Sequence, residues 1–250
     1  MKDVLRDADL DLTPLDGLLV SVIGFGNQGH AHALNLRDSG IDVQVGLREG
    51  SKTRPEVRGQ GLRPVSLQKA AEADVVMVLV PDEVQPELLA SVELNPKAVV
   101  LFGHGFALHH GLVTLPSPEA AVVAPVGPGH LLRRAYTEGE GNPGLIATAE
   151  GSTDTTLRIA RAYARALGLG RAGGVLATVA EEVETDLFGE QAVICGGVSA
   201  LIRCGFEVLV EAGYPAELAY FECAHQMKLL VDLIHERGLA GMRDAISNTA

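Results

Sequence analysis

The sequence is poor in aromatic residues and in cysteine. It contains no tryptophan, and only 4% of its 250 residues are aromatic. The three cysteines, Cys195, Cys204 and Cys223, are odd in number and form no C-x-x-C pair. This argues against a disulfide framework and a paired-cysteine metal site. We interpret the three as reduced thiols on helices of a cytoplasmic protein.

Long apolar runs and excess positive charge are also lacking. No uninterrupted apolar stretch is as long as the about 20 residues that a membrane-spanning helix needs. The start of the sequence lacks the apolar segment that is typical of a signal peptide. Lys and Arg number 20 against 32 Asp and Glu, a formal net charge of −12. We therefore expect neither a membrane nor a nucleic acid as partner, because phosphate binding draws on clustered cations. A small-molecule substrate is the expected partner.

The first part of the chain alternates short β-rich apolar runs with helical stretches. The alternation and the 29 glycines predict an α/β fold, with a Rossmann-type, doubly wound parallel sheet covered by helices. The expected strands are Leu18 to Ile23, Ile41 to Leu47, Val75 to Val80, Ala98 to Phe102, Ala121 to Ala124 and Leu145 to Thr148.

The last part of the chain has a different pattern. Three helical stretches are expected, at Glu181 to Ala192, Val198 to Ala212 and Glu217 to Glu236. Gly213 with Pro215, and Gly238, are predicted helix stops. We therefore divide the chain into a nucleotide-binding domain, residues 1–180, and an all-helical domain, residues 181–250.

A glycine-rich turn lies between the first strand and the first helix. Its residues are Gly24, Phe25, Gly26, Asn27, Gln28 and Gly29, in the G-x-G-x-x-G spacing. In that context the first glycine permits a tight turn, the second lets backbone approach a pyrophosphate and the third lets helix pack on strand. Free N–H groups at the helix N-terminus then bind the anion. The alternative is an ordinary strand-to-helix corner.

The loop after the second strand indicates which dinucleotide binds. NAD-binding proteins usually place an acid here to bond the ribose 2′-hydroxyl. The one acid in this loop, Glu49, is flanked by basic residues and is expected to point to solvent. Arg48, Ser51 and Thr53 could hold a 2′-phosphate, with Lys52 and Arg54 adding positive charge in the neighbouring positions. NADPH is therefore the expected cofactor. The alternative is a solvated loop that binds nothing.

Carboxylates recur at helical spacing in the second domain. Asp186 and Glu190 are four residues apart, and Glu222 and Gln226 repeat this spacing on another helix. Three carboxylates and an amide on facing helices could bind Mg²⁺, which prefers oxygen ligands. The alternative is that these acids are solvated surface charges.

Long motifs of the chain resemble ketol-acid reductoisomerases over essentially its whole length. The segments that carry the resemblance are Gly26 to Gly40, Gly46 to Lys52, Pro81-Asp82-Glu83 with Gln85, His104-Gly105-Phe106, Gly127 to Leu131 with Arg133-Arg134, Glu184 to Gln191, Cys195-Gly196-Gly197, Ala219 to Cys223, and Ile246 to Ala250. That family reduces and rearranges 2-acetolactate-type acids with NADPH and two Mg²⁺ ions. The resemblance also implies a knotted helical domain and a homodimer whose active sites are shared between subunits.

The resemblance assigns roles to individual residues. Cofactor contacts are implied for Phe25 to Gln28, Arg48, Ser51, Thr53, Asp82, Gln85 and Gly129. His104 is implied at the reacting centre, and Ser247 as a substrate contact. Asp186 is implied as the bridging metal ligand, with Glu190 and Glu222 beside it; these three join His104 as the expected catalytic residues.

Two residues depart from the family pattern. Gln226 stands where the family presents a glutamate, and Val126 stands where the motif Pro-Lys-Gly-Pro-Gly-His has lysine. Alkyl migration depends more heavily on local charge than hydride transfer does. Our leading hypothesis is therefore an NADPH-dependent reductase of a small 2-oxo acid, ketone or cyclic imine that has lost the migration, with Mg²⁺ in doubt at the second site. The alternatives are an authentic ketol-acid reductoisomerase and an inactive NADPH-binding partner or sensor.

Overall fold

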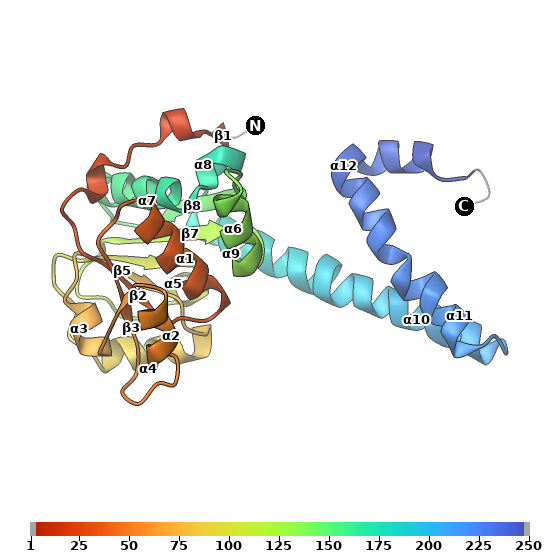
Figure 1. Ribbon diagram of the computed structural model, residues 1–250, viewed down its shortest axis with the longest axis horizontal. Helices are drawn as coiled ribbons and strands as arrows, with labels where there is room; N and C mark the ends of the chain where they lie inside the picture. Colours follow the sequence, from red (N-terminus) through yellow and green to blue (C-terminus); the bar gives the residue numbers. More distant parts are fainter. Residues whose placement is uncertain (1–3, 248–250) are drawn as a thin grey trace. The chain divides into compact units, whose positions relative to one another are not determined.

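The computed structural model describes residues 4–247, and the chain forms two compact units that divide between Glu184 and Thr185. The first unit is built on one nine-stranded sheet (Figure 1). Its strands are β1 (Val4–Leu5), β2 (Val20–Ile23), β3 (Val43–Gly46), β4 (Arg63–Val65), β5 (Val75–Val78), β6 (Val99–Phe102), β7 (Ala120–Pro125), β8 (Gly144–Thr148) and β9 (Gly174–Leu176).

The strand order is β1-β9-β8-β7-β6-β5-β2-β3-β4. The six strands from β7 to β4 in this order are parallel to one another, which confirms the predicted Rossmann-type arrangement. The sheet is nevertheless mixed, because β8 runs antiparallel to β7 and β1 runs antiparallel to β9. The sequence analysis did not predict β1, β4 or β9, since runs of two or three residues give no recognisable alternation.

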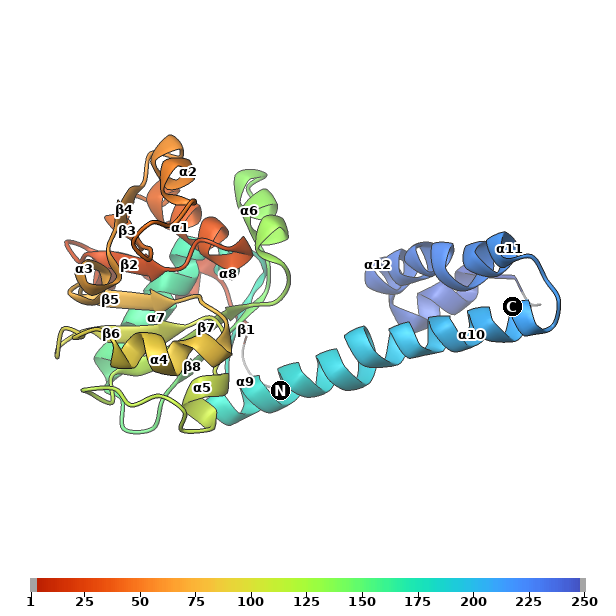
Figure 2. The ribbon, with the colours of Figure 1, turned by 90° about the horizontal axis from the view of Figure 1, so that it is seen from below.

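Two hydrophobic cores lie on the two faces of the sheet. Strands β2, β5 and β6 are buried on both faces, so their β-branched side chains contribute alternately to each core. Helices α1 and α7 pack in one core, while α3 and α4 pack in the other, and Figure 2 shows α1 and α4 on opposite sides of the strands. The helices of this unit are α1 (Asn27–Asp38), α2 (Arg54–Gly59), α3 (Leu67–Ala71), α4 (Gln85–Ala90), α5 (Phe106–His109), α6 (Gly129–Thr137), α7 (Asp154–Leu167) and α8 (Leu169–Ala172), with the 3-10 turns η1 (Asp7–Asp9), η2 (Thr13–Leu15) and η3 (Asp82–Val84).

The chain order along the sheet reverses between β2 and β5. From β2 the chain runs outward to β3 and β4, and then returns to add β5, β6 and β7 on the other side. In open α/β sheets the crevice at the carboxyl ends of the strands beside such a switch point binds ligands. The loops after β2, β3, β5, β6 and β7 therefore define where a site should lie.

The second unit is helical. Helix α9 (Val179–Phe188) crosses from the first unit and continues through the π-helical segment η4 (Gly189–Val198) into α10 (Ser199–Glu211). The chain then turns at Gly213 (φ 90°) and forms α11 (Ala216–Tyr220), the π-helical segment η5 (Phe221–His225) and α12 (Met227–Ala245). Gly238 interrupts α12 with φ 69° and ψ 175°, so the predicted stop is a break after which a helix resumes.

Apolar side chains of the second unit are exposed in the single chain. Those with large exposed surfaces are Phe188, Val193, Ile194, Leu201, Val208, Val210, Tyr214, Leu218, Tyr220, Phe221, Leu229, Val231 and Leu239. Within residues 4–247, the continuous helix Val179–Glu211 is long and apolar enough by composition to cross a membrane. Glu190 and Arg203 interrupt its apolar sequence, and protein-packed helices pass the same test. An exposed apolar surface of this extent is typical of an interaction site.

Candidate active site

The glycine turn after β2 has the geometry of a pyrophosphate cradle. Gly24 has a φ of 102°, and a β-carbon there would lie 2.6 Å from the Leu79 carbonyl oxygen. A β-carbon on Gly29 would collide with the Gly24 carbonyl oxygen, so only glycine lets α1 begin this close to β2. Gly26 has open space where its side chain would be. No side chain caps the N-terminus of α1, so its first backbone N–H groups are left for another acceptor, and the pyrophosphate contact stays a prediction.

The loop between β7 and α6 is fastened to this turn. The His130 N–H donates to Asn27 Oδ1 at 2.8 Å, and Gln28 Nε2 donates to the Gly127 carbonyl oxygen at 2.8 Å. A β-carbon on Gly129 would collide with the Asn27 carbonyl oxygen. The structure therefore brings Gly129 next to Asn27 and Gln28, which precede it by about a hundred positions in the sequence. All three are predicted cofactor residues.

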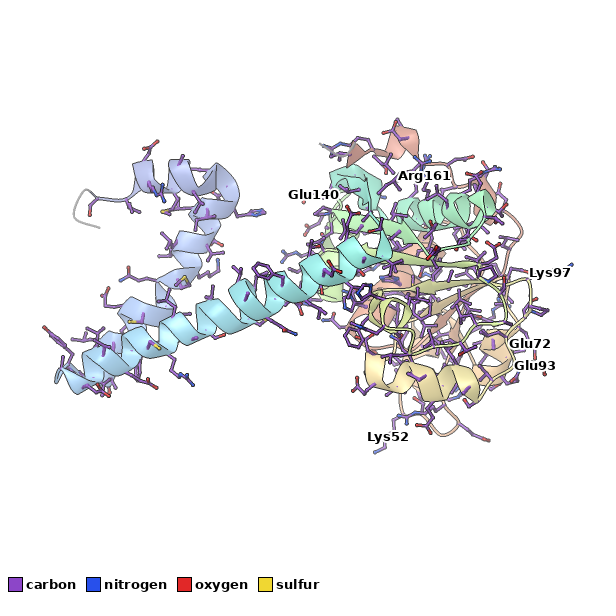
Figure 3. The ribbon with its side chains drawn as sticks, turned by 180° about the vertical axis from the view of Figure 1, so that it is seen from behind. Lys52, Glu72, Glu93, Lys97, Glu140 and Arg161 are labelled. Atoms are coloured by element: carbon purple, nitrogen blue, oxygen red, sulfur yellow. The ribbon has the colours of Figure 1, made fainter. Side chains whose placement is uncertain are left out.

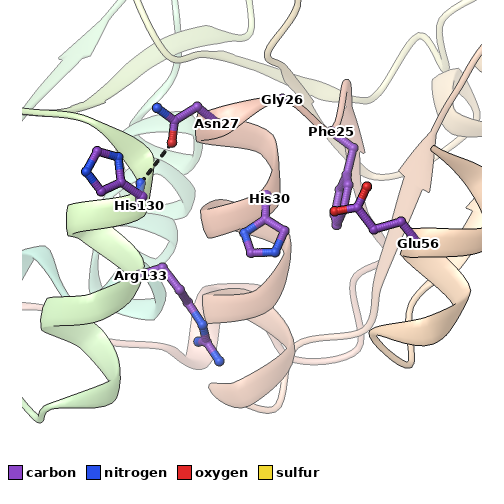
Figure 4. Close-up of a pocket in the computed structure, with 7 residues that line it drawn as sticks. All are labelled: Phe25, Gly26, Asn27, His30, Glu56, His130 and Arg133. Atoms are coloured by element: carbon purple, nitrogen blue, oxygen red, sulfur yellow. Dashed lines mark hydrogen bonds between the residues drawn. The ribbon is translucent and has the colours of Figure 1, made fainter. Parts of the chain in front are cut away.

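A cavity of about 340 Å³ opens beside the turn. It is lined by Phe25, Gly26, Asn27, His30, Glu56, His130 and Arg133, which come from the turn, α1, α2 and α6 (Figure 4). His30, which the sequence analysis left without a role, is one wall of this cavity, and its ring meets that of Phe25 edge-on with 5.2 Å between centroids. Arg133 donates to Asn35 Oδ1 and to Asp38 Oδ2, and the Asp38 carboxylate is shared with Arg37.

The loop after β3 lies next to the turn, because β2 and β3 are parallel and Ile23 pairs with Gly46. Arg48 is exposed, and Ser51 Oγ accepts the Thr53 N–H at 3.3 Å, which orders the loop around the two predicted hydroxyl ligands. Lys52 extends away from the unit into solvent (Figure 3). Arg54 Nη1 donates to the Val65 carbonyl oxygen at 3.2 Å, so part of its hydrogen-bonding capacity is used within the fold.

The loop after β5 carries Asp82 and Gln85. Gln85 is buried, and its Nε2 donates to Asp82 Oδ1 at 2.9 Å and to the Val80 carbonyl oxygen at 3.1 Å. Burial raises the pKa of the Asp82 carboxyl, and the field of His104 opposes this rise. The buried Oε1 atoms of Gln85 and of Gln28 have no hydrogen-bond partner among residues 4–247. Buried acceptors without a hydrogen-bond partner are uncommon in folded proteins. A bound ligand could supply the missing donors to these two oxygens at the carboxyl edge of the sheet.

His104 follows β6 and is held by a carboxylate that sequence reasoning missed. Glu182 on α9 is buried, with Oε1 3.0 Å from His104 Nδ1 and Oε2 accepting the Gly105 N–H at 2.9 Å. A β-carbon on Gly105 would lie 2.9 Å from Glu182 Oε2, so glycine is needed for this approach. The arrangement directs His104 Nε2 away from Glu182. A buried acid at the start of a helix rich in acids gave no sequence signal, because only its burial distinguishes it from its neighbours.

The predicted metal ligands lie in the second unit. Asp186 belongs to α9, Glu190 to η4 and Glu222 to η5, and all three are exposed in the single chain. Gln226 Nε2 donates to Glu222 Oε2 at 2.7 Å. Within residues 4–247, no three His, Cys, Asp or Glu side chains converge as a metal site. Ser247 is exposed after the end of α12.

Family models match both parts of the chain. Residues 14–173 match the acetohydroxy acid isomeroreductase NADPH-binding domain, and residues 179–250 match the ketol-acid reductoisomerase C-terminal domain. The chain belongs to the ketol-acid reductoisomerase family. It is 51% identical to a ketol-acid reductoisomerase (NADP(+)) of Kineococcus radiotolerans, over 100% of this chain and 75% of that protein. It is also 51% identical to a ketol-acid reductoisomerase (NADP(+)) of Saccharopolyspora erythraea, over 99% of this chain and 76% of that protein.

Solved structures agree with this membership. An NADH-preferring ketol-acid reductoisomerase from an uncultured archaeon superimposes with a TM-score of 0.91 at 41% identity, covering 99% of this chain and 78% of the other. A pyrroline carboxylate reductase of Plasmodium falciparum with NADP bound is 14% identical, with a TM-score of 0.54 over 94% of this chain and 87% of the other, and shows only the shared fold.

The residues of this family member fit NADPH. The open turn at Gly26, the unsatisfied acceptors of Gln28 and Gln85 and the Arg48-Ser51-Thr53 loop form one continuous edge of the sheet. For Mg²⁺ the donor chemistry fits, since Asp186, Glu190 and Glu222 supply hard carboxylate oxygens. Within residues 4–247, however, these three side chains do not converge as a metal site.

Proposed function

We propose that this chain catalyses the NADPH-dependent ketol-acid reductoisomerase reaction, in which a 2-acetolactate-type acid undergoes alkyl migration and carbonyl reduction. The observation that carries the proposal is the His104–Glu182 pair at the carboxyl edge of an NADPH-binding sheet, in a chain 51% identical to relatives with that name. The authentic reductoisomerase, an alternative in the sequence analysis, thereby becomes the principal candidate. The cytoplasmic location stays a prediction.

The chain's own residues divide the work. Bound NADPH supplies the hydride. The turn Gly24 to Gly29 holds its pyrophosphate by backbone N–H groups, and Arg48, Ser51 and Thr53 hold its 2′-phosphate. Asp82 and Gln85 would also contact the cofactor. His104, fixed at Nδ1 by Glu182, presents Nε2 to move a proton at the substrate oxygen, directly or through one water.

Asp186, Glu190 and Glu222 would hold Mg²⁺, whose chemistry is to polarise adjacent substrate oxygens. We propose that a homodimer completes these sites. Exposed apolar side chains along α10, η5 and α12 would be covered by a partner surface. The carboxylates on α9, η4 and η5 do not converge in a group of three within residues 4–247, so a partner could supply the missing ligands. Ser247 would then contact the substrate from the end of α12.

The dimer is tested by the mass in solution. Sedimentation equilibrium should give twice the chain mass of 26.2 kDa or a multiple of that dimer. Leu201→Asp with Val208→Asp should yield monomers that still bind NADPH but lose Mg²⁺-dependent turnover. Leu112→Asp, at another exposed apolar residue but in the first unit, is the control. A wild-type monomer with full activity would exclude the shared site.

A second candidate is a reductase that lacks alkyl migration. Two observations favour it: Gln226 already occupies Glu222 Oε2 with an amide hydrogen, and Val126, 56% exposed, adds neither charge nor donor at the end of β7. Both reduce the local charge that migration depends on, while hydride transfer needs mainly a held nicotinamide and a polarised carbonyl.

One assay separates the candidates. NADPH oxidation is followed with 2-acetolactate, which must migrate first, and with its rearranged 3-hydroxy-2-oxo isomer, which needs reduction only. Comparable turnover of both, abolished by EDTA and restored by Mg²⁺, supports the reductoisomerase. Turnover of the isomer, other 2-oxo acids or a cyclic imine, without 2-acetolactate, supports the reductase. NADPH binding without turnover of any substrate leaves the inactive binder or sensor.

A further inference from the structure

The cavity beside the phosphate turn contains one carboxylate, that of Glu56, on its lining. Glu56 lies in the first turn of α2, three positions after Thr53, and is exposed. Figure 4 shows it projecting from α2 toward the cavity on the side of Phe25. It is therefore in the corner between the pyrophosphate turn and the loop that carries the predicted 2′-phosphate ligands.

No cation neutralises this carboxylate within the part of the chain that the structure describes. The ion pairs of residues 4–247 do not include Glu56. Arg133, the one arginine on the cavity lining, is paired with Asp38 and extends away from the turn (Figure 4). Lys52 extends into solvent, and Arg54 is hydrogen-bonded to the Val65 carbonyl oxygen. Within the described residues, Glu56 thus places a carboxylate without an ion pair next to an anion-binding corner.

We infer that Glu56 helps to set the cofactor preference of this chain. Its negative charge lowers the affinity for NADPH, which carries the 2′-phosphate, relative to the affinity for NADH, which does not. The inference deepens the proposed function and rests on it. NADPH and NADH share the pyrophosphate and differ only in the 2′-phosphate, so a charge close to the latter changes the two affinities unequally. Arg48 attracts that phosphate, whereas Glu56 repels it and adds to the negative charge of Glu49 in the loop itself, so removal of the Glu56 charge shifts the balance toward NADPH. Family members differ in this preference, as the NADH-preferring archaeal relative shows.

The size of the effect follows from exposure. A solvated carboxylate acts on a phosphate through water and is screened over about 8 Å at physiological ionic strength, so removal of its charge should strengthen NADPH binding by only about two- to fivefold. The change should shrink as salt is added. Charge reversal at the same position should have a larger effect in the same direction.

The test measures binding rather than turnover. Dissociation constants of NADPH and NADH are determined by cofactor fluorescence titration for the wild type, Glu56→Gln and Glu56→Lys, at low and high salt. The expected result is an NADPH affinity raised about two- to fivefold in Glu56→Gln, and further in Glu56→Lys, with NADH affinity unchanged. Arg48→Ala should move the same ratio in the opposite direction.

The matched control is Glu150→Gln, which removes the same charge from an exposed carboxylate. Glu150 follows β8, whose last residue, Thr148, pairs with Ala121 near the start of β7, so it lies at the opposite edge of the sheet from the cavity. An unchanged NADPH-to-NADH ratio in both Glu56 variants, or equal changes for both cofactors, would overturn the inference. If the wild type bound neither dinucleotide, the proposed function itself would fail instead.

Discussion

Glu182 Oε1 lies 3.0 Å from His104 Nδ1, and Oε2 of the same carboxylate accepts the Gly105 N–H at 2.9 Å. One buried acid therefore fixes both the side chain and the following backbone of the residue expected at the reacting centre. This contact fastens the loop after β6 to the start of α9. The hydrogen bond to Nδ1 also determines which ring nitrogen faces the substrate.

Replacement of Glu182 should impair catalysis more than cofactor binding. In Glu182→Gln an amide nitrogen replaces one of the two carboxylate oxygens and the negative charge is lost. The single remaining oxygen cannot contact both His104 Nδ1 and the Gly105 N–H. We expect kcat to fall about 10²-fold, while the Kd for NADPH changes less than about twofold. Steady-state kinetics and fluorescence titration measure the two quantities. Glu184→Gln on the exposed side of the same helix is the control; equal losses in both variants would count against a role for Glu182 in orienting His104.

Gly129→Ala should weaken binding of NADPH and NADH alike. Its β-carbon would collide with the Asn27 carbonyl oxygen, which is backbone and cannot rotate away, so the turn and the α6 loop must separate. We expect at least about a tenfold rise in both dissociation constants, which corresponds to the about 1.4 kcal/mol of one lost hydrogen bond. Gly59→Ala, where the β-carbon meets open space, should bind both cofactors as the wild type does.

Gln226→Glu should favour alkyl migration over reduction. The change replaces the amide that donates to Glu222 with a second carboxylate, and two adjacent acids attract a divalent cation more strongly. We expect tighter Mg²⁺ binding by calorimetry and a higher ratio of 2-acetolactate turnover to turnover of the rearranged substrate. Gln191→Glu adds the same charge at an exposed position of η4 and is the comparison. An unaltered ratio would mean that position 226 does not limit migration.

His32 should make the fold less stable in acid. The ring is fully buried, its Nδ1 lies 3.1 Å from the Tyr163 hydroxyl, and burial lowers the pKa of His32 from 6.5 to about 3. The unfolded chain therefore binds a proton below pH 6.5 that the folded chain does not, so stability falls as the pH drops from 6.5 toward 3.

Urea unfolding measures this dependence. Between pH 6.5 and 5 the contribution of His32 to the free energy of unfolding should decrease by about 2 kcal/mol. His32→Asn should be destabilised at neutral pH and should lose that part of the slope, whereas His235→Asn, exposed on α12, should keep it. Parallel pH profiles of His32→Asn and the wild type would refute the assignment.

Local pattern was sufficient for the central strands and the phosphate turn. Strands β2, β3, β5, β6, β7 and β8 lie within one or two residues of the expected runs, apart from ends that fray beside loops. The antiparallel direction of β8 was not predictable, because a short apolar run has the same composition in either direction. The short strands β1, β4 and β9 form only because a neighbouring strand supplies hydrogen bonds, which local sequence does not encode.

For the candidate site, too, some features follow from local sequence and others depend on tertiary structure. The residues from Gly24 to Gly29 and from Arg48 to Thr53 act through spacing of a few positions, so the sequence by itself determined the kind of cofactor and the loops that hold it. Tertiary structure decided what those loops meet: Glu182 reaches His104 across 78 positions, Gly129 fits against Asn27, and Glu56 enters the cavity beside the turn. Such contacts depend on how whole helices pack on the sheet, and packing is a sum over many distant side chains rather than a property of any one segment.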